Sequence, residues 1–189
     1  MHSDAERMTL ILNGSPRKRG DTASLLRILR EDLAGEIREV DCYRADISPC
    51  IDCRSCRREL RCVIDDGMQA LYPYIRACDR IVIASPIYYG ELTGKLLDVA
   101  SRFQPYYYAR FLRQEDPGLR PKKGGVVLVG GGDGDPKKAY ATAKILLRQL
   151  NVTEVFPLIC SHGTNTLPAI EDEKAVSAVR KLAEFLNET

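Results

Sequence analysis

Short, continuous apolar runs that alternate with amphipathic helical segments are the feature that most constrains this fold. A run that is apolar at nearly every position is typical of a parallel strand with helices on both of its faces. Strands and helices that alternate in this way form a doubly wound sheet, whose ligands bind outside the carboxyl ends of the strands. We therefore predict a three-layer α/β sandwich with a five-stranded parallel sheet in the order 2-1-3-4-5. The expected strands are Met8–Leu12, Ile37–Tyr43, Arg80–Ser85, Val126–Val129 and Val155–Ile159.

Apolar residues recur at helical spacing between these runs and predict the covering helices. Asp135-Pro136 is a typical helix start, with an N-cap residue followed by a first-turn proline. Two segments depart from the alternation: a cysteine-bearing loop at 44–66 and an insertion at 104–123. No linker separates them from the rest, so we expect one domain over residues 1–189. The other expected helices follow the first glycine-bearing loop and cover about Met68–Cys78, Thr93–Phe103 and Glu171–Leu186.

Composition indicates an ordinary globular protein, with 44% hydrophobic and 29% charged residues in a chain of 189. The formal net charge of +2 is too near neutral to indicate nucleic acid or a membrane surface as a partner. No run approaches the ~18 apolar residues of a membrane span, and the polar start lacks the apolar core of a signal peptide. We therefore expect a cytoplasmic protein. In a reducing compartment, the seven cysteines indicate metal or redox chemistry before disulfides.

The loop after the first expected strand, Asn13–Ala23, has the composition of a phosphate-binding loop. It leaves a strand and opens a helix, so free N–H groups and the positive end of the helix dipole would face a ligand there. The hydroxyls of Ser15 and Thr22 can donate to phosphate oxygens, and Arg17 can add a charge-assisted contact. The loop lacks both the Walker A ending and the G-x-G-x-x-G of a dinucleotide fold. A phosphate monoester bound without metal remains, whereas an ordinary helix cap would explain only Asp21 and Thr22.

Two further loops at the same edge suit a planar ligand. Ser85–Gly94 combines a stiffening Pro86 with two adjacent tyrosines and Gly90, which permits close backbone approach. Gly130–Asp135 begins with three successive glycines, which suit a backbone that lies against a flat ring. An ordinary turn with surface tyrosines, or a flexible surface turn, stays open as the alternative for each loop alone.

Together these loops resemble a known family. Gly-Ser-Pro-Arg-x-x-Gly-x-Thr after the first strand and Ser-Pro-Ile-Tyr-Tyr-Gly-x-x-Thr-Gly after the third are similar to the NADPH-dependent FMN reductase group of flavodoxin-like proteins. The resemblance spans nearly the whole chain and implies a flavodoxin-like fold that binds FMN, with the phosphate in the first loop and the isoalloxazine ring between the other two. The candidate phosphate-binding residues are Ser15, Arg17, Lys18, Asp21, Thr22 and Ala23, and the candidate ring-binding residues are Pro86, Ile87, Tyr88, Tyr89, Gly90, Gly131, Gly132 and Asp133.

Asp21 departs from the family pattern, which usually has asparagine at this position. A carboxylate that pointed inward would repel a phosphate because the two carry like charges. We therefore expect Asp21 to cap the helix that follows the loop.

Four cysteines form a second motif, C-x2-C-x2-C-x5-C, on one short segment: Cys50, Cys53, Cys56 and Cys62. Soft ligands at this spacing suit an iron–sulfur cluster, whereas zinc more often uses two separated pairs. Neighbouring arginines would favour thiolates and offset the negative charge of a cluster. The motif is similar to that of the iron–sulfur flavoproteins, a branch of the same family that binds a 4Fe–4S cluster. Other members share this segment without a known cluster, so free or redox-labile cysteines stay open as the alternative.

No Ser–His–Asp arrangement or carboxylate pair indicates a catalytic side chain, so we expect the cofactor to carry the chemistry. The leading hypothesis is an oxidoreductase in which NAD(P)H reduces FMN and the electrons pass to an unidentified acceptor, through a cluster where one is present. One alternative is a non-enzymatic electron carrier like flavodoxin, although such carriers are usually strongly acidic. A structural zinc module is the other.

The insertion at 104–123 is rich in aromatic residues, among them Tyr106, Tyr107, Tyr108 and Phe111. Aromatic side chains concentrate in interface cores. We therefore expect a homodimer or homotetramer with these side chains in its contact. Packing over the protein's own sheet edge is the alternative.

Overall fold

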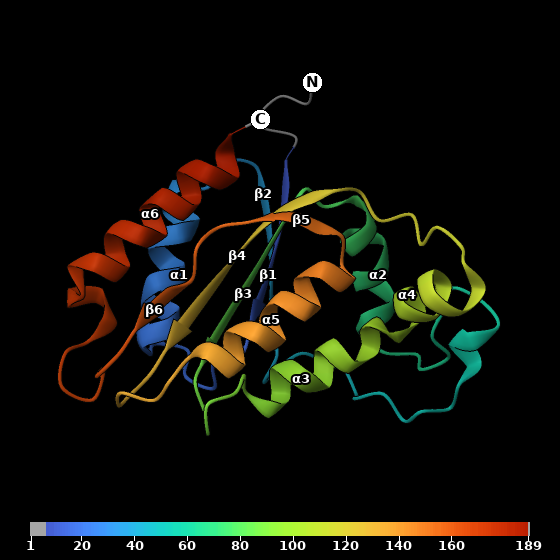
Figure 1. Ribbon diagram of the computed structural model, residues 1–189, viewed down its shortest axis with the longest axis horizontal. Coiled ribbons are helices and arrows are strands. Elements are labelled where there is room, and N and C mark those ends of the chain that lie inside the picture. The colour runs from blue at the N-terminus through green and yellow to red at the C-terminus, as the bar shows by residue number, and fades with distance from the viewer. Residues whose placement is uncertain (1–6, 189) are drawn as a thin grey trace.

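A computed structural model describes residues 7–188, which form a parallel sheet covered by helices (Figure 1). The strands lie in the order β2-β1-β3-β4-β5, with β6 also paired to β4, and every neighbouring pair is parallel. The predicted flavodoxin-like α/β fold is confirmed. The strands are β1 Met8–Asn13, β2 Glu36–Asp41, β3 Arg80–Pro86, β4 Lys122–Val129, β5 Val152–Val155 and β6 Ile159–Ser161.

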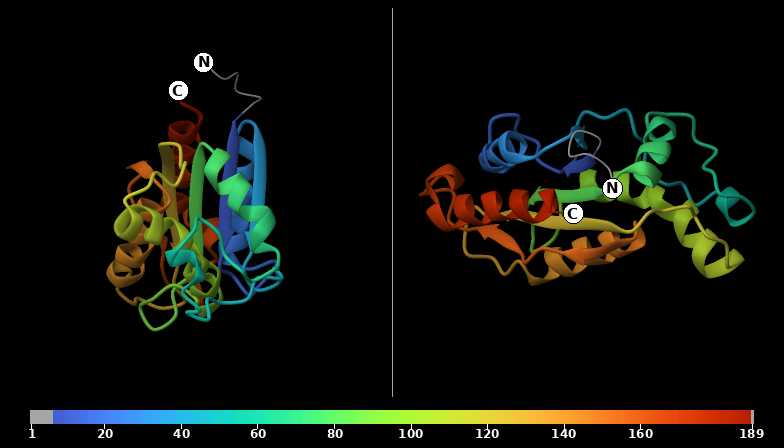
Figure 2. Two further views of the ribbon diagram at one scale, coloured as in Figure 1. Left: turned by 90° about the vertical axis from the view of Figure 1, so that its right-hand side faces the viewer. Right: turned by 90° about the horizontal axis from the view of Figure 1, so that it is seen from above.

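Helices cover both faces of the sheet, as the unbroken apolar runs predict (Figures 1 and 2). Leu10 and Leu12 of β1 pack in the core on one side, and Ile11 between them packs in the core on the other. This alternation follows from the period of two along a strand. On one face lie α1 Asp21–Asp32 and α6 Glu173–Asn187, and on the other lie α2 Met68–Ala77, α3 Gly94–Ala100 and α5 Lys137–Gln149.

The fifth strand differs from the expected Val155–Ile159. The chain instead pairs with β4 in two pieces, β5 and β6, and residues 156–158 between them are not in a strand. Pro157 stands in the gap, and proline has no N–H with which to continue a ladder. The apolar run therefore marks the break between the pieces, and β4 is long enough to pair with both of them.

The segment 104–123 is not a simple insertion, because its first half is helical. A 3-10 helix at Ser101–Phe103 continues α3, followed by α4 Gln104–Tyr108 and a π-helix at Ala109–Arg113. Pro105 is tolerated because it lies in the first turn of α4, where its missing N–H is not needed. Tyr106 is buried, and its hydroxyl donates to the carbonyl of Tyr72 at 3.1 Å. Its expected role in an oligomer contact is therefore wrong.

Two helix starts also differ from expectation by a residue or two. Pro136 holds the N-cap position of α5, and the carboxylate of Asp135 accepts a hydrogen bond from the N–H of Lys137 at 2.9 Å. Asp172 is the N-cap of α6, and its side chain accepts from the N–H of Ala175 at 3.1 Å. Every helix within residues 7–188 is too short or too polar to span a bilayer. The polar start of the chain, for which no signal peptide is expected, lies largely outside the described residues.

Candidate functional site

A cavity of about 140 Å³ lies at the carboxyl ends of β1 and β3, where the strand order reverses. Such a switch point is the usual ligand site of a doubly wound sheet. Its walls come from the loop after β1, the loop after β3 and the glycine-rich loop after β4. The cavity brings together eight of the predicted residues: Ser15, Arg17, Asp21, Thr22, Pro86, Ile87, Tyr88 and Gly131.

The loop after β1 is held in shape by its own side chains and by α3. Asn13 Oδ1 accepts a hydrogen bond from the N–H of Ser15 at 2.9 Å, and Ser15 Oγ accepts one from the N–H of Arg17 at 3.2 Å. Thr93, just before α3, donates from Oγ1 to the carbonyl of Gly14 at 2.8 Å. A Cβ on Gly14 would lie 2.7 Å from Thr93 Oγ1, so only glycine allows this close approach.

The start of α1 offers the cavity hydrogen-bond donors that the protein does not use. Gly20 is the N-cap and provides no side-chain cap, so the N–H groups of Asp21, Thr22 and Ala23 have no protein acceptor among the described residues. Thr22 is buried, yet its hydroxyl makes no hydrogen bond with any residue in 7–188. Backbone donors, a free hydroxyl and the positive end of the helix dipole form a donor set that fits a phosphate.

Asp21 does not cap α1, contrary to expectation, because Gly20 occupies the N-cap position. Its Oδ1 instead accepts a hydrogen bond from the N–H of Ala169 at 2.9 Å. This contact ties the start of α1 to the 3-10 helix Ala169–Glu171, which precedes α6. The carboxylate still lines the cavity and places a negative charge beside the free donors.

The loop after β3 turns back on itself through a tight two-residue turn. Tyr88 and Glu91 exchange both backbone hydrogen bonds at 3.0 Å. Tyr89 and Gly90, at the tip, have φ angles of 54° and 75°, in the left-handed region that suits glycine but strains tyrosine. Tyr88 lines the cavity, whereas Tyr89 is fully exposed at the tip.

The glycine-rich loop after β4 packs against the loop that follows β6. The N–H of Gly130 donates to the carbonyl of Ser161 at 2.8 Å, and the N–H of Thr164 donates to the carbonyl of Gly130 at 3.1 Å. A Cβ on Gly131 would lie 2.9 Å from the side chain of Asn165. Thr164 and Asn165 line the cavity and were not predicted. The signal available for both is their position directly after the last strand, whose carboxyl end meets the same edge.

The remaining predicted residues do not line this cavity. Ala23 contributes only its backbone N–H, which belongs to the first turn of α1 and has no acceptor among the described residues. Gly132 and Asp133 are exposed, and a Cβ on Gly132 would meet no atom within 4 Å. The residues left outside the cavity wall are Lys18, Ala23, Tyr89, Gly90, Gly132 and Asp133.

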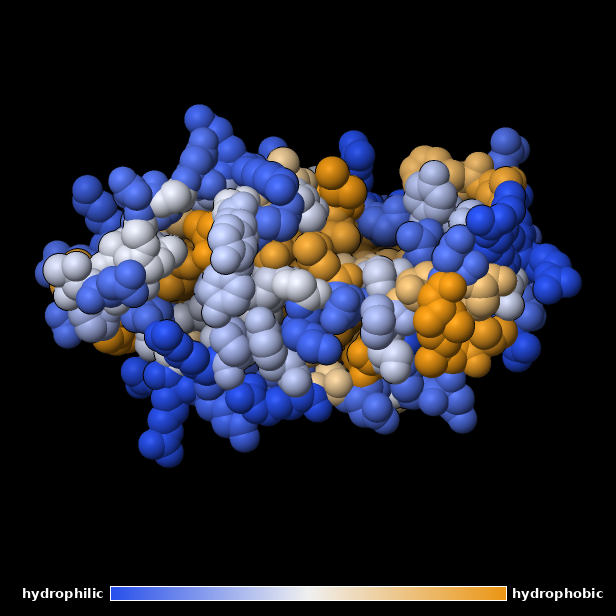
Figure 3. All heavy atoms as spheres, turned by 90° about the horizontal axis from the view of Figure 1, so that it is seen from below, coloured by the Kyte–Doolittle hydropathy of each residue, from blue (hydrophilic) through white to orange (hydrophobic). Residues whose placement is uncertain are grey.

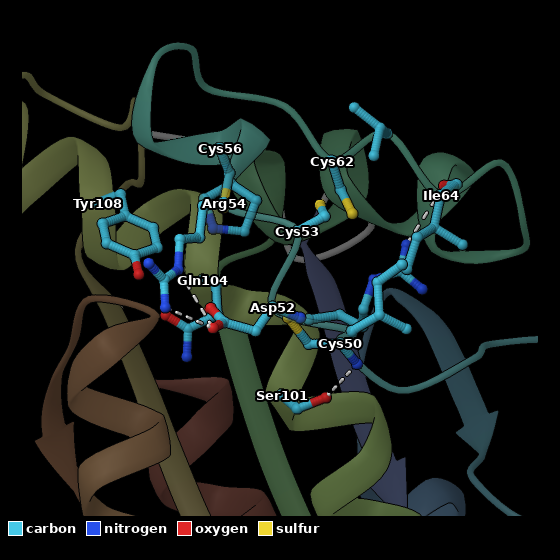
Figure 4. A pocket seen from close by; sticks show the side chains of 14 residues that line it. Cys50, Asp52, Cys53, Arg54, Cys56, Cys62, Ile64, Ser101, Gln104 and Tyr108 are labelled. Carbon is cyan, nitrogen blue, oxygen red and sulfur yellow. Dashed lines mark hydrogen bonds and ion pairs between the residues drawn. The ribbon is translucent and has the colours of Figure 1, made fainter.

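The four cysteines of the C-x2-C-x2-C-x5-C motif line a second cavity, of about 170 Å³ (Figure 4). They lie on the cysteine loop, residues 48–66, whose one helical turn is the 3-10 helix Ser55–Arg57. All four are free thiols. The opposite wall comes from the helical segment 101–113, which contributes Ser101, Arg102, Gln104, Pro105 and Tyr108.

The thiols in this cavity differ in how readily they ionise. Hydrogen bonds from the backbone and side chain of Ser55 lower the pKa of Cys53 below its ordinary value. Burial raises the pKa of Cys56, and the charges of the other three motif cysteines raise it further. Within residues 7–188, no group of three or more His, Cys, Asp or Glu side chains lies close enough to hold a metal ion.

A buried ion pair closes the neck of the cysteine loop, the place where its first residues (Ser48) and its last residues (Ile64 and Asp66) come together. The side chains of Arg102 and Asp66 are 0% and 6% exposed, and Arg102 Nη1 donates to Asp66 Oδ2 at 2.6 Å. The same guanidinium donates to the carbonyls of Ser48 at 2.8 Å and Ile64 at 3.3 Å, so one side chain holds both ends of the loop. Burial alone would raise the pKa of Asp66, but hydrogen bonds from Arg102 and from backbone N–H groups outweigh it and hold that pKa below its ordinary value.

The helical segment 101–113 also anchors the middle of the cysteine loop. The N–H of Cys50 donates to Ser101 Oγ at 2.9 Å, and Arg113 Nη1 donates to the carbonyl of Cys56 at 2.6 Å. The guanidinium of Arg57 lies 5.8 Å from the centroid of the Tyr108 ring, a cation–π contact. This segment is therefore the packing partner of the cysteine loop, and both lie together at one end of the molecule (Figure 2).

Apolar side chains reach the surface on the face formed by the carboxyl ends of the strands (Figure 3). They gather in patches that hydrophilic residues border, and a large patch lies at the end that carries the cysteine loop. Ile51 and Val63 of that loop are exposed, as are Tyr107, Phe111 and Leu112 of the helical segment 101–113. Exposed apolar side chains of the cysteine loop and of the helical segment 101–113 therefore gather at this end of the molecule.

The cysteines outside the motif are set apart from both cavities. Cys42 and Cys78 are buried in the core, and burial raises the pKa of each thiol to about 12. Cys160 Sγ lies 3.2 Å from His162 Nε2 at the end of β6, and burial raises the pKa of Cys160 to about 11. Thiols this reluctant to ionise are poor nucleophiles and poor metal ligands.

Comparison with known sequences places these features in a family. The sequence model of the NADPH-dependent FMN reductase family matches residues 8–164. An iron–sulfur flavoprotein of Archaeoglobus fulgidus is 29% identical over 178 residues, which cover 90% of this chain and 76% of the relative. An iron–sulfur flavoprotein of Methanosarcina thermophila is 31% identical over 123 residues, which cover 64% of this chain and 61% of the relative. The chain thus spans less than two thirds of the length of the second relative.

Solved structures support the same fold at lower identity. An NAD(P)H:quinone oxidoreductase from Methanothermobacter marburgensis has a TM-score of 0.74 and 17% identity, covering 98% of this chain and 99% of its own. RosB with a bound 8-demethyl-8-formylriboflavin-5'-phosphate has a TM-score of 0.66 and 20% identity, covering 96% of this chain and 76% of its own. An azoreductase from Bacillus anthracis has a TM-score of 0.63 and 14% identity, covering 97% of this chain and all of its own.

Proposed function

Because the chain belongs to the NADPH-dependent FMN reductase family, and is thus a flavin-dependent oxidoreductase, we propose that it holds FMN in the cavity at the carboxyl ends of β1 and β3 and takes electrons from NAD(P)H. The observation that carries this proposal is the start of α1, where three N–H groups and the Thr22 hydroxyl have no hydrogen-bond partner within residues 7–188. The first N–H groups of any helix lack a partner within the helix, and here they open into a cavity where an anion can accept from them. Here they are arranged as an anion site.

At the phosphate end, the free donors of α1 and the side chain of Arg17 would bind the dianion. Ser15 Oγ, which already shapes the turn, lies beside them. At the ring end, Pro86, Ile87 and Tyr88 would border one edge of the isoalloxazine, and the Gly131 backbone would approach it closely. FMN, when bound, supplies hydride and electron transfer, and the role of these residues is to orient it.

A comparison of FMN with riboflavin tests this assignment, because riboflavin has the same ring and no phosphate. We expect purified protein to carry flavin absorbance, and the apoprotein to bind FMN at least about a hundredfold more tightly than riboflavin. A colourless protein that takes up no added FMN would contradict the proposal. Equal affinity for the two flavins would contradict the role of α1.

Turnover separates the proposed enzyme from a non-enzymatic electron carrier. The FMN-loaded protein should oxidise NADH or NADPH steadily when an excess of an artificial electron acceptor such as ferricyanide is present. A matched sample loaded with riboflavin, or left without flavin, serves as the control. A protein that binds FMN but is not reduced by either nucleotide would be a carrier of the flavodoxin kind.

We further propose that the four motif cysteines bind a 4Fe–4S cluster. The supporting observation is that all four free thiols line one cavity of about 170 Å³. A single zinc ion needs its sulfur ligands about 2.3 Å from one point, whereas a cluster needs thiolates spread around a volume. The donor set therefore fits a cluster, and the iron–sulfur flavoprotein relatives agree with it.

Iron and acid-labile sulfide, measured on anaerobically purified protein, test the cluster. We expect about four of each per chain and a broad brown absorbance beside the flavin bands. Cys56→Ser should abolish both, whereas Cys160→Ser, outside the motif, should keep them. Zinc without iron would contradict the proposal and favour the structural zinc site.

We also propose that the protein works as a cytoplasmic homodimer or homotetramer, with Tyr107 and Phe111 in the contact. Both side chains are exposed and touch each other, with ring centroids 5.0 Å apart. Light scattering at micromolar concentration should give a mass above the 21.2 kDa of one chain. Phe111→Glu should then reduce it, and a wild-type monomer would contradict the proposal.

A further inference from the structure

The side chain that closes the cysteine loop has one hydrogen-bond donor left over. Both terminal nitrogens of Arg102 donate hydrogen bonds, to the carboxylate of Asp66 and to the carbonyls of Ser48 and Ile64. Its Nε–H is buried and has no partner among the described residues. A buried, unpaired donor on a charged group is costly and calls for an acceptor.

The surroundings of Arg102 indicate what that acceptor is. Arg102 lines the same cavity as the four motif cysteines, and Cys62 is the one whose charge acts on it most strongly. Thiolate and inorganic sulfur accept hydrogen bonds from N–H groups, and such bonds help to set the reduction potential of a cluster.

We propose that Arg102 is the positioning residue of the four-cysteine site: it closes the neck of the cysteine loop and donates its Nε–H to sulfur within the cavity. The closing role needs only the observed contacts, because Ser48 on one side and Ile64 and Asp66 on the other enclose all four cysteines. The donor role rests on the proposed cluster. Arginine alone among the side chains can do both, because its fork offers donors in several directions at once.

The closing role is tested without a cluster, by the rate at which iodoacetamide alkylates each cysteine of the apoprotein, read by peptide mass spectrometry. In Arg102→Gln, the buried Cys56 should react at least about tenfold faster than in wild type, because the loop opens more often. Cys53 is already exposed and should change little. Cys42 and Cys78 report on the core and should stay protected.

Two variants keep this test decisive. If Cys42 and Cys78 of Arg102→Gln also become reactive, the whole fold has opened, and Asp66→Asn, which keeps the shape of the partner, replaces it with the same expectation for Cys56. Arg54→Gln is the matched control, because Arg54 lines the same cavity but is exposed, and among residues 7–188 its side chain pairs only with Asp52. It should leave the rate at Cys56 unchanged.

The donor role is read from the reduction potential of the cluster in reconstituted protein. We expect the potential to be more negative in Arg102→Gln than in wild type and intermediate in Arg102→Lys. The shift in Arg54→Gln should be much smaller than in Arg102→Gln, because the charge of Arg54 is exposed and screened by solvent. A positive charge and an N–H donor both stabilise the reduced, more negative cluster, which explains the sign. An Arg102→Gln protein that folds, protects Cys56 as wild type does and keeps the wild-type potential would overturn the proposal. If wild-type protein takes up iron and sulfide in no preparation, the cluster and the donor role fail together, and the alkylation rates alone decide the closing role.

Discussion

Replacing Thr22 by valine removes one oxygen and keeps the shape of a buried side chain at the start of α1. Because the Thr22 hydroxyl has no partner among residues 7–188, the apoprotein loses no hydrogen bond. The complex with FMN does lose a hydrogen bond, the one expected between the Thr22 hydroxyl and the phosphate. A hydrogen bond to a charged group contributes about 1.5–3 kcal/mol, and each 1.4 kcal/mol is tenfold in affinity, so the Kd for FMN should rise about 10- to 150-fold.

Quenching of flavin fluorescence during titration of the apoprotein measures this Kd, and urea unfolding measures stability. Riboflavin affinity should not change in Thr22→Val, because the hydroxyl is assigned to the phosphate. The free energy of unfolding of the apoprotein should stay about equal, because the hydroxyl that is removed lines the cavity and makes no hydrogen bond within residues 7–188.

Thr9→Val is the matched control. Thr9 Oγ1 is buried and has no partner among the described residues, and it lies in β1 away from the cavity. This variant should gain stability and keep the wild-type Kd for FMN. An unchanged FMN affinity in Thr22→Val, or an equal loss for riboflavin, would refute the reasoning that places the phosphate at α1.

Three further outcomes follow from the same geometry. Asp21→Asn keeps the hydrogen-bond acceptor and removes a like charge beside the phosphate site, so FMN should bind several-fold more tightly at low salt, as the same titration would show. Burial raises the pKa of Cys42 and of Cys78 from 9.0 to about 12, so each thiol ionises at a lower pH in the unfolded chain than in the folded one. Each thiol should therefore lower the free energy of unfolding by about 2 kcal/mol at about pH 10.5 relative to pH 8, as urea unfolding would show. Replacing either cysteine by alanine should make this loss of stability at high pH smaller. Gly125→Ala would place a Cβ 2.6 Å from Leu182 of α6 and should lower the free energy of unfolding by about 1–3 kcal/mol, whereas an unchanged urea midpoint would contradict that packing.

What could be predicted from sequence is largely what is local. The unbroken apolar run around Ile11 indicates a strand covered on both faces, and the glycine and hydroxyl residues between Asn13 and Ala23 indicate a phosphate loop. Both depend on neighbours in the chain. The break at Pro157 was predictable too, since proline in a run argues against an uninterrupted strand. The prediction that Asp21 caps α1 was wrong, because its carboxylate accepts a hydrogen bond from the N–H of Ala169, which is distant in sequence.

Long-range pairing accounts for most of the rest. Asp66 and Arg102 are 36 residues apart, and no local pattern couples them, although Asp66 follows the last cysteine of the motif by four residues. The same holds for Thr164 and Asn165, which complete the cavity from the far end of the chain. Residues 104–113 belong to the predicted insertion, although they are helical. Their turns change type, from α to π after a 3-10 turn at Ser101–Phe103, and so carry no constant period.

Helix α3 connects the residues that hold the two cavities in place. Thr93, just before it, donates a hydrogen bond to the loop after β1, and Ser101 and Arg102, just after it, make hydrogen bonds to the cysteine loop. At 1.5 Å per residue its seven residues make a rod of about 10 Å. Within one chain, the length of this short helix therefore sets the distance between the two sites. Adding one turn of α3 would lengthen that spacing by about 5.4 Å without altering a residue of either site.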